Sequence, residues 1–200
     1  MLKFDIHTSN LCKRINAKTF LLAKSIFLFT EKFRSILFKL FIQSHFDYCS
    51  SLFLHLSNSD SNKLERCFAK SIRRLLDVDL DGLELNEQFK LLSRYKIFPL
   101  RYRKFYHMCS FIFNIFFTNN KLNNSLKKKI KRNEHTSRRS FAYPSFKTKT
   151  NKYSFATIST KILNNLKNLK IKEINKKEIF LNKLKLNINI YYNLCSNDWT

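Results

Sequence analysis

The stretch KLERCFAKSIRRLL, residues 63–76, carries two different faces in one helical pattern. Its apolar residues recur at intervals of three and four, which predicts a single buried stripe on an amphipathic α-helix. The stripe consists of Leu64, Phe68, Ile72 and Leu75. The polar side carries the cations Lys63, Arg66, Lys70, Arg73 and Arg74. Because such a helix needs other helices to cover its stripe, this stretch predicts a helical bundle.

Composition supports a mostly α fold. The 200 residues include only 1 Gly and 2 Pro. Tight hairpin turns that require positive φ are therefore scarce, which argues against an all-β fold. Phosphate-binding loops of the Gly-x-Gly-x-x-Gly and Walker A types each need several glycines, so these classes of nucleotide-binding protein are excluded.

Further helices are expected on both sides of this stretch. A first helix capped by Ser9 or Asn10 extends to about residue 29. A second, long helix starts after Thr30 and continues into residues 42–53. Its apolar face is expected to hold Phe33, Leu37, Leu40, Phe41 and Ser44. After a turn at 77–82, a short helix covers 85–95, and Pro99 stands in the first turn of a helix that reaches about residue 117.

The chain is expected to have three parts. Residues 1–118 form the helical bundle. Residues 119–153 form a basic linker, partly extended or disordered, with FAYPSFKT extended around Pro144. Residues 154–200 form a tail of helices, one capped by Ser154 and one at about 172–191.

The charge indicates the class of partner. The net charge is +24, and residues 119–191 alone hold 19 basic and three acidic residues. Self-repulsion of this size is relieved by a polyanion, so nucleic acid is the first expectation and an anionic membrane surface the second. The apolar windows are too short for a membrane span, and no membrane partner is expected.

The same composition bears on location. The 5 cysteines form no Cys-x-x-Cys pair, which predicts free thiols in a reduced, intracellular compartment. Two basic runs, 127–132 and the one containing Arg138 and Arg139, are interpreted as nucleic-acid patches, as a nuclear localisation signal, or as a basic linker.

The stretch IQSHFDYCSSLF, residues 42–53, places His45, Asp47 and Cys49 within five positions. A zinc site needs three or four ligands, and the other histidines lack the usual spacing. A nucleophilic Cys–His pair needs an exposed thiolate, whereas the neighbours of Cys49 are aromatic. The favoured interpretation is a core helix in which Asp47 and His45 bond nearby backbone or basic side chains.

Several segments, taken in order, resemble one family. LFIQSHFDYCSSLF is similar to the segment that follows the polymerase core in jockey-like non-LTR retrotransposon reverse transcriptases, which are RNA-directed DNA polymerases. LKFDIHTSNLCKRINAKTFLL, NKLERCFAKSIRRLL, LNEQFKLLSRYKIFPLRYRKFYHMCSFIFNIF and RRSFAYPSFKTKTNKYSFATISTKILNNL resemble further segments in the family's order. The positions that match its motifs are His45, Asp47, Tyr48, Cys49, Pro144, Phe155 and Asn164. Cys67 stands where Gln is usual, Leu163 stands where the family has Trp, and no Pro follows Leu166.

The resemblance implies the thumb and post-thumb part of such an enzyme. Reverse transcriptases hold two metal ions with a carboxylate pair and a third Asp. This sequence has no such pair, and Asp77, Asp79 and Asp81 lack the Glu that completes a calcium loop. Magnesium is thus expected only in a palm that this chain lacks, no cofactor is expected here, and the chain is not expected to polymerise by itself.

A thumb implies contact with an RNA or DNA template–primer duplex. The cations of residues 63–74 suit phosphate contacts without sequence preference, although a solvated helix face explains them equally well. Basic residues also interleave with Tyr95, Tyr102 and Tyr106, which predicts either stacking on bases or core packing. These further candidates are Arg101, Arg103 and Lys104. The alternative function is a helical, basic RNA-binding protein unrelated to polymerases.

Overall fold

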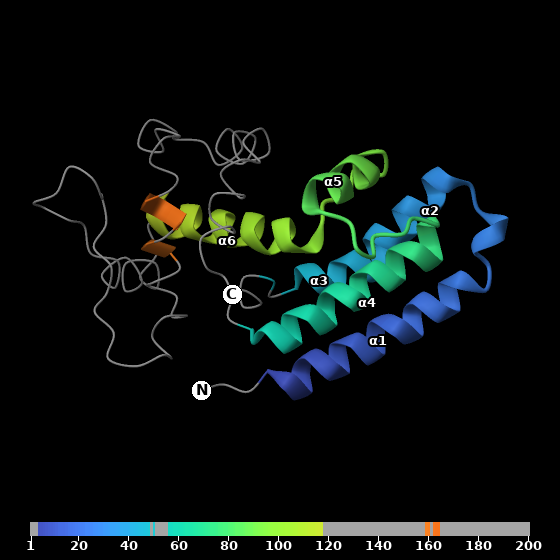
Figure 1. Ribbon diagram of the computed structural model, residues 1–200, viewed down its shortest axis with the longest axis horizontal. Helices are drawn as coiled ribbons and strands as arrows, with labels where there is room; N and C mark the ends of the chain where they lie inside the picture. The colour runs from blue at the N-terminus through green and yellow to red at the C-terminus, as the bar shows by residue number, and fades with distance from the viewer. Residues whose placement is uncertain (1–3, 49, 51–55, 118–158, 161, 165–200) are drawn as a thin grey trace, which may run out of the picture. The chain divides into compact units, whose positions relative to one another are not determined.

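The computed structural model describes residues 4–48, 50, 56–117, 159–160 and 162–164, and every structural statement below concerns these residues. They are mostly helical and contain no strand, which confirms the predicted fold class (Figure 1). The elements are α1 (Asp5–Ala23), η1 (Ile26–Leu28), α2 (Glu31–Leu37), η2 (Phe38–Gln43), α3 (Ser44–Asp47), α4 (Asn58–Leu76), α5 (Leu85–Ser93) and α6 (Leu100–Phe117).

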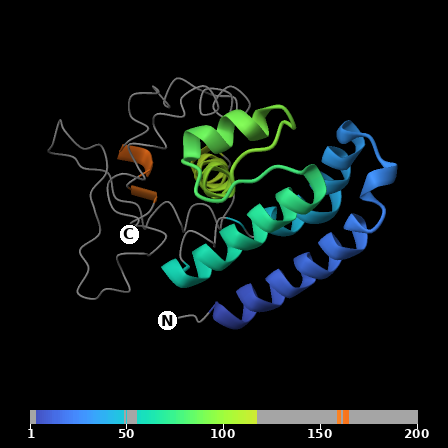
Figure 2. The same ribbon diagram turned by 45° about the vertical axis from the view of Figure 1, so that its right-hand side comes forward.

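The chain divides into two compact units, residues 1–104 and 105–200, with the division inside α6. The first unit holds the bundle of α1, α2 and α4, which lie side by side in both Figure 1 and Figure 2. The predicted boundary at residue 118 stays a prediction.

Helix α1 differs at both ends from the expected helix of residues 9–29. It begins at Asp5, whose carboxylate in the first turn interacts favourably with the positive end of the helix dipole. It ends at Ala23, and a short 3₁₀-helix, η1, follows. Ile15 is fully buried, and Leu11, Leu22 and Ile26 pack against the core, so the predicted apolar spacing is correct although the caps are wrong.

The helix predicted after Thr30 forms, but its buried face was predicted wrongly. Elements α2, η2 and α3 follow one another without a break from Glu31 to Asp47, and η2 is a π-helix. The residues that face the core are Ser35, Phe38, Ile42 and Phe46. Their spacing of three, four and four residues is an ordinary helical spacing, and it belongs to a different face of the run from the predicted one. Phe33, Leu40 and Phe41, expected inside, are instead exposed.

Helix α4 confirms the predicted stripe. Leu64, Phe68, Ile72 and Leu75 are all buried. The helix begins earlier than expected because Ser57 caps it: the Ser57 hydroxyl accepts a hydrogen bond from the Asp60 backbone N–H at 3.1 Å. It ends at Leu76, and the following residue, Asp77, adopts the left-handed conformation with φ 56° that commonly terminates helices.

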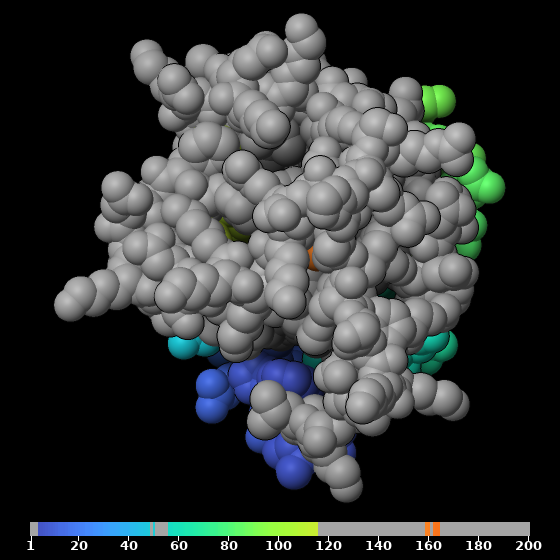
Figure 3. All heavy atoms as spheres, turned by 90° about the vertical axis from the view of Figure 1, so that its left-hand side faces the viewer, coloured from blue at the N-terminus to red at the C-terminus, as the bar shows by residue number. Residues whose placement is uncertain are grey.

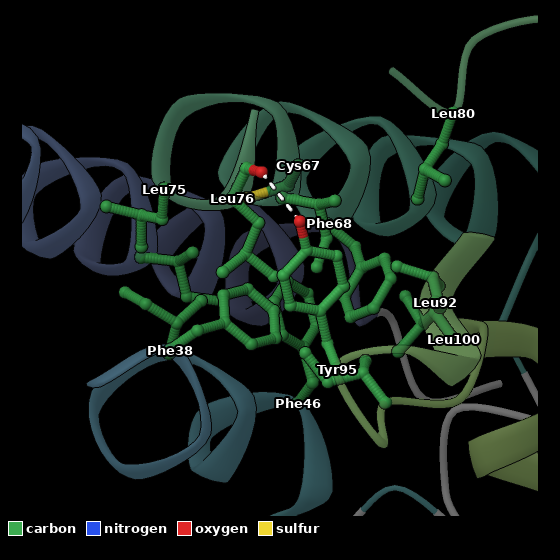
Figure 4. Close-up of a cluster of buried hydrophobic side chains, with 14 of the residues drawn as sticks. Phe38, Phe46, Cys67, Phe68, Leu75, Leu76, Leu80, Leu92, Tyr95 and Leu100 are labelled. Carbon is green, nitrogen blue, oxygen red and sulfur yellow. Dashed lines mark hydrogen bonds between the residues drawn. The ribbon is translucent and has the colours of Figure 1, made fainter. Parts of the chain in front are cut away.

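The core is centred on Phe68 (Figure 4). Phe38 and Phe46 each meet its ring edge-to-face, with centroids 5.8 and 5.4 Å away. Tyr95 donates a hydrogen bond to the Leu76 carbonyl at 3.2 Å, and Ser35 donates one to the Tyr95 carbonyl at 3.1 Å. These contacts join the α2–α3 run, α4 and the segment after α5 into one packed body.

Helices α5 and α6 form close to where they were predicted. A capping box between Glu84 and Glu87 starts α5 at Leu85. Pro99 precedes α6, and its carbonyl accepts from the Arg103 backbone N–H at 3.0 Å.

Part of the predicted tail can also be compared. Residues 159–160 and 162–164 are helical, in agreement with the helix expected after Ser154. The linker of 119–153 and the helix of 172–191 lie outside the described residues. No helix in the described part of the chain has both the length and the apolar character to cross a membrane.

Replacing Phe68 by alanine tests the core. Phe68 is 2% exposed, so the change should lower the free energy of unfolding by about 3–5 kcal/mol through lost burial and a residual cavity. Phe41→Ala is the matched control, because the apolar pattern assigned Phe41 to the core whereas its side chain is 47% exposed. It should cost less than about 1 kcal/mol. Urea unfolding of both variants measures the two losses of stability. Equal losses would contradict the exposed position of Phe41 on η2.

Candidate nucleic-acid interface

The candidate interface is the cationic side of α4, here called the α4 ridge and defined as Lys63, Arg66, Lys70, Arg73 and Arg74. All five side chains are exposed, while the opposite side of the same helix is buried in the core. Two have acidic partners: Lys63 lies 3.4 Å from Asp60 and Arg73 lies 3.5 Å from Asp79. Exposed ion pairs of this kind contribute little, so phosphate oxygens can replace the carboxylates at small cost.

A groove of about 380 Å³ between α1 and α4 adjoins the ridge. Its lining residues are Ser9, Cys12, Asn16, Lys63, Arg66, Cys67 and Lys70. Three of them are cationic and none is acidic, so the groove is positively charged. Sequence reasoning missed the α1 contribution of Ser9 and Asn16. Their spacing with Cys12 at three- and four-residue intervals places them on one helix face, but only packing shows which helix that face meets. Exposed side chains of α1 form part of the surface that Figure 3 draws as blue spheres.

A second cavity, of about 290 Å³, lies between α4 and the segment that leads into α5. Its charged lining residues are Glu65, Arg66, Asp81, Glu84 and Arg101. Three carboxylates among them oppose a phosphate, so this cavity does not extend the cationic surface.

The three cations predicted on α6 are engaged within the protein. Arg101 remains exposed but donates from Nε to Glu65 Oε2 at 2.7 Å. Arg103 makes a bidentate pair with Asp47, its Nε donating to Oδ1 at 2.9 Å, and its side chain is only 13% exposed. Lys104 is 3% exposed and donates to Ser61 Oγ at 3.0 Å, with Glu65 Oε1 3.8 Å away. Arg103 and Lys104 are therefore held by partners within the protein, and their predicted contact with nucleic acid stays a prediction.

Two of the tyrosines interleaved with these cations also lie inside the protein. Tyr95 and Tyr102 are buried, and Tyr102 packs edge-to-face on Phe89 with centroids 5.0 Å apart. Of the two predicted roles, core packing is thus the correct one for both. Arg138 and Arg139 lie outside the described residues, so their role stays a prediction.

Asp47 and His45 have the basic partners that the core-helix interpretation requires. Asp47 binds Arg103, and His45 Nε2 lies 2.7 Å from Lys18 Nζ. Partial burial, followed by the charges of Lys18 and Arg14, lowers the pKa of His45, which favours a neutral ring that accepts from Lys18. Within the described residues no group of three His, Cys, Asp or Glu side chains is placed to hold a metal ion.

The other family-motif positions are less informative. Tyr48 is exposed, and Asn164 lies in the short helical segment near residue 162. Cys49, Pro144 and Phe155 lie outside the described residues.

Comparison of the chain with known protein families, with curated proteins and with solved structures found no match.

Replacing Arg103 by glutamine separates structure from binding. The change leaves the partly buried Asp47 carboxylate without its bidentate partner, so the free energy of unfolding should fall by about 1–3 kcal/mol. The salt dependence of duplex binding should not change. Arg101→Gln, at a 60% exposed side chain, is the control and should change stability by less than about 1 kcal/mol. Normal stability with weakened binding in Arg103→Gln would return this residue to the interface.

Lys104 gives a pH-dependent prediction. Burial lowers its pKa to about 8, despite the opposing attraction of Glu65. The unfolded chain, with the ordinary pKa near 10.5, binds the proton more tightly, so the folded state gains stability as pH rises from about 8 to 10.5. The gain relative to Lys104→Met should approach about 3 kcal/mol. Urea unfolding of both proteins across this range measures the difference, and a constant difference would contradict the burial of a titrating ammonium.

Proposed function

We propose that this chain is a nucleic-acid-binding module of the thumb type, which holds an RNA or DNA template–primer duplex through its phosphates. In this proposal it is the carboxyl-terminal part of a non-LTR retrotransposon reverse transcriptase, separated from the palm that would hold magnesium and polymerise. The observation that carries the binding proposal is the α4 ridge, with five exposed cations on one helix whose opposite face is locked into the core.

The chemistry of the ridge determines the kind of recognition. Lysine and arginine side chains bind phosphate oxygens, and the counterions they displace from the nucleic acid supply most of the free energy. Such contacts fix position on a backbone but carry no base information. The proposed binding is therefore weak in sequence preference and strongly dependent on salt.

The rigidity of α4 favours binding by the α4 ridge over binding by positive charge spread over the whole chain. The buried stripe of Leu64, Phe68, Ile72 and Leu75 fixes the rotation of α4, and the Ser57 cap and the Asp77 terminator fix its ends. The cations are consequently presented at fixed positions between Lys63 and Arg74, a row about 17 Å long at 1.5 Å per residue. A rigid row of this length matches several successive phosphates of a duplex.

The thumb assignment itself rests on the ordered resemblance of the segments in residues 2–168, together with the helical bundle. Asp47 and His45, which belong to the most characteristic of those segments, connect α3 to α6 and α1 through Arg103 and Lys18. These contacts give the motif a structural role, in keeping with a bundle that supports a binding surface.

The triple change Lys70→Gln, Arg73→Gln and Arg74→Gln tests the ridge. Each phosphate contact contributes close to one unit to the slope of log K against log salt. The triple variant should therefore lower that slope by about two to three units and weaken duplex binding at low salt. Helicity should stay nearly constant, because exposed charges contribute little to folding. Fluorescence anisotropy with an RNA–DNA hybrid at four salt concentrations, alongside circular dichroism, measures both.

Two control triples carry the same loss of charge. One replaces the exposed residues Lys13 and Arg14 of α1 and Lys24 directly after it by glutamine, and the other replaces Lys127, Lys128 and Lys129 of the basic run by glutamine. Binding by the α4 ridge predicts that the α4 triple lowers the salt slope and the affinity for the duplex far more than either control triple. Equal effects of all three triples would show that binding is a diffuse response to net charge, and would favour the alternative of a basic RNA-binding protein unrelated to polymerases.

A further inference from the structure

Two thiols meet in the groove between α1 and α4. Cys12 of α1 is half-buried and lines the groove, while Cys67 of α4 is 5% exposed behind it. Both thiols line the groove. Cys67 Sγ also lies 3.9 Å from the Cys12 carbonyl and 3.8 Å from Asn16 Oδ1, and Cys12 Sγ lies 3.9 Å from the Lys63 carbonyl.

The surroundings of the pair favour a thiolate on Cys12 and a thiol on Cys67. The hydrogen bond from Cys67 lowers the pKa of Cys12, burial opposes it, and the charge of Lys63 lowers it further. The same hydrogen bond and burial raise the pKa of Cys67. Titratable and charged groups facing Cys12 in the groove are Lys63, Arg66, Cys67 and Lys70, all on α4, while α1 contributes the neutral Ser9 and Asn16. Asp60 shares the charge of Lys63 at 3.4 Å, which leaves Arg66 and Lys70 as the unshared cations of the lining.

We propose that Cys12 is a reactive-thiol site that exchanges with small anionic disulfides, which enter the groove between α1 and α4 against Arg66 and Lys70. Cys67 is its positioning residue and stabilises the thiolate as a hydrogen-bond donor. A thiolate in a partly exposed, electropositive setting is the reactive form of cysteine. The groove of about 380 Å³ is large enough for a ligand with the size and carboxylates of such a disulfide.

The reaction is a thiol–disulfide exchange. The Cys12 thiolate attacks one sulfur of the small disulfide, forms a new S–S bond to it and expels the other sulfur as a thiolate, which then takes a proton from water. The Cys12 sulfur is oxidised and the expelled sulfur is reduced, so the small disulfide is the only oxidant required. Reduction by excess small thiol reverses the step.

The exchange has a consequence for nucleic-acid binding, and this part rests on the proposed function. The adduct leaves carboxylates beside Lys63, Arg66 and Lys70, three of the five residues of the α4 ridge. Anions fixed there compete with phosphates for the same cations. Modified protein should therefore bind a duplex more weakly and with a smaller salt slope than reduced protein.

The full chain, reduced and then freed of reductant, is treated with 5,5′-dithiobis(2-nitrobenzoate), a disulfide with two carboxylates. Peptide mapping by mass spectrometry assigns each modified cysteine, and the tryptic peptide of residues 4–13 contains Cys12 alone. Cys12 should react at pH 6.5 while Cys67 and Cys109 of the same folded protein do not. Its rate should fall at least about threefold in Cys67→Ala, because less of Cys12 is then ionised.

Lys70→Gln provides a second variant that leaves the helix packing intact, with Lys24→Gln, directly after α1, as its control. Lys70→Gln should slow the anionic reagent by more than it slows the uncharged bis(2-hydroxyethyl) disulfide, whereas Lys24→Gln should slow neither. A Cys12 that stays unmodified in the folded chain, or reacts at a rate unaffected by Cys67→Ala and Lys70→Gln, would overturn the reactive-thiol site.

Duplex binding of the modified protein completes the test. An affinity at least about threefold lower, restored by reductant, supports the competition between adduct and phosphates. Modification of Cys12 without any change in affinity would overturn that competition. Failure of the reduced protein to bind any duplex would instead count against the proposed function and leave the thiol chemistry standing.

Discussion

The structure depends on the packing of Phe68 between Phe38 and Phe46. These three rings join α4 to the run of helix from Glu31 to Asp47, with edge-to-face contacts at 5.8 and 5.4 Å. The contact requires Phe38 and Phe46 to share one face, although they are eight residues apart. The buried residues Ser35, Phe38, Ile42 and Phe46 recur at intervals of three and four, which keeps them on one face of this continuous run of helix. Once α4 is held in this way, its rotation is fixed and its cations point to solvent.

The position of a cation on α4 or α6 relative to the core decides whether its side chain is exposed or is paired inside the protein. Those on α4 lie opposite the buried stripe and stay exposed, with at most an exposed carboxylate nearby. Arg103 and Lys104, by contrast, are drawn inside and need Asp47, Glu65 and Ser61 as partners, because an unpaired buried charge is costly. A high net charge therefore includes residues that support the fold as well as residues that are free to meet a polyanion.

The groove between α1 and α4 lies where the packing of α4 meets its exposed cations. Thr19 and Ser71 hydrogen-bond at 3.1 Å within the contact between these helices, and the Cys12–Cys67 pair lies nearer to the start of each. Polar contacts of this kind hold α1 in register on α4, while the outer face of α1 stays exposed to solvent. The same register places a thiol among cations, which is the chemical basis of the reactive site proposed for Cys12. The proposed binding surface and the proposed thiol site share Lys63, Arg66 and Lys70, so the two proposals together predict that occupation of one weakens the other.

The sequence by itself determined the helical class, the buried stripe of α4, the turn after Leu76 and the start of α5, because these follow from local periodicity and capping. It also indicated partners for Asp47 and His45 without identifying them. Only the tertiary structure decided that Phe38 and Phe46, and not Phe33 and Phe41, face the core, since large apolar residues occupy both sides of this run of helix and periodicity does not choose between them. It likewise decided which cations are free. Lys70 and Lys104 are the same residue type in similar basic stretches, and only the packing of α4 and α6 leaves one in water and buries the other beside Glu65.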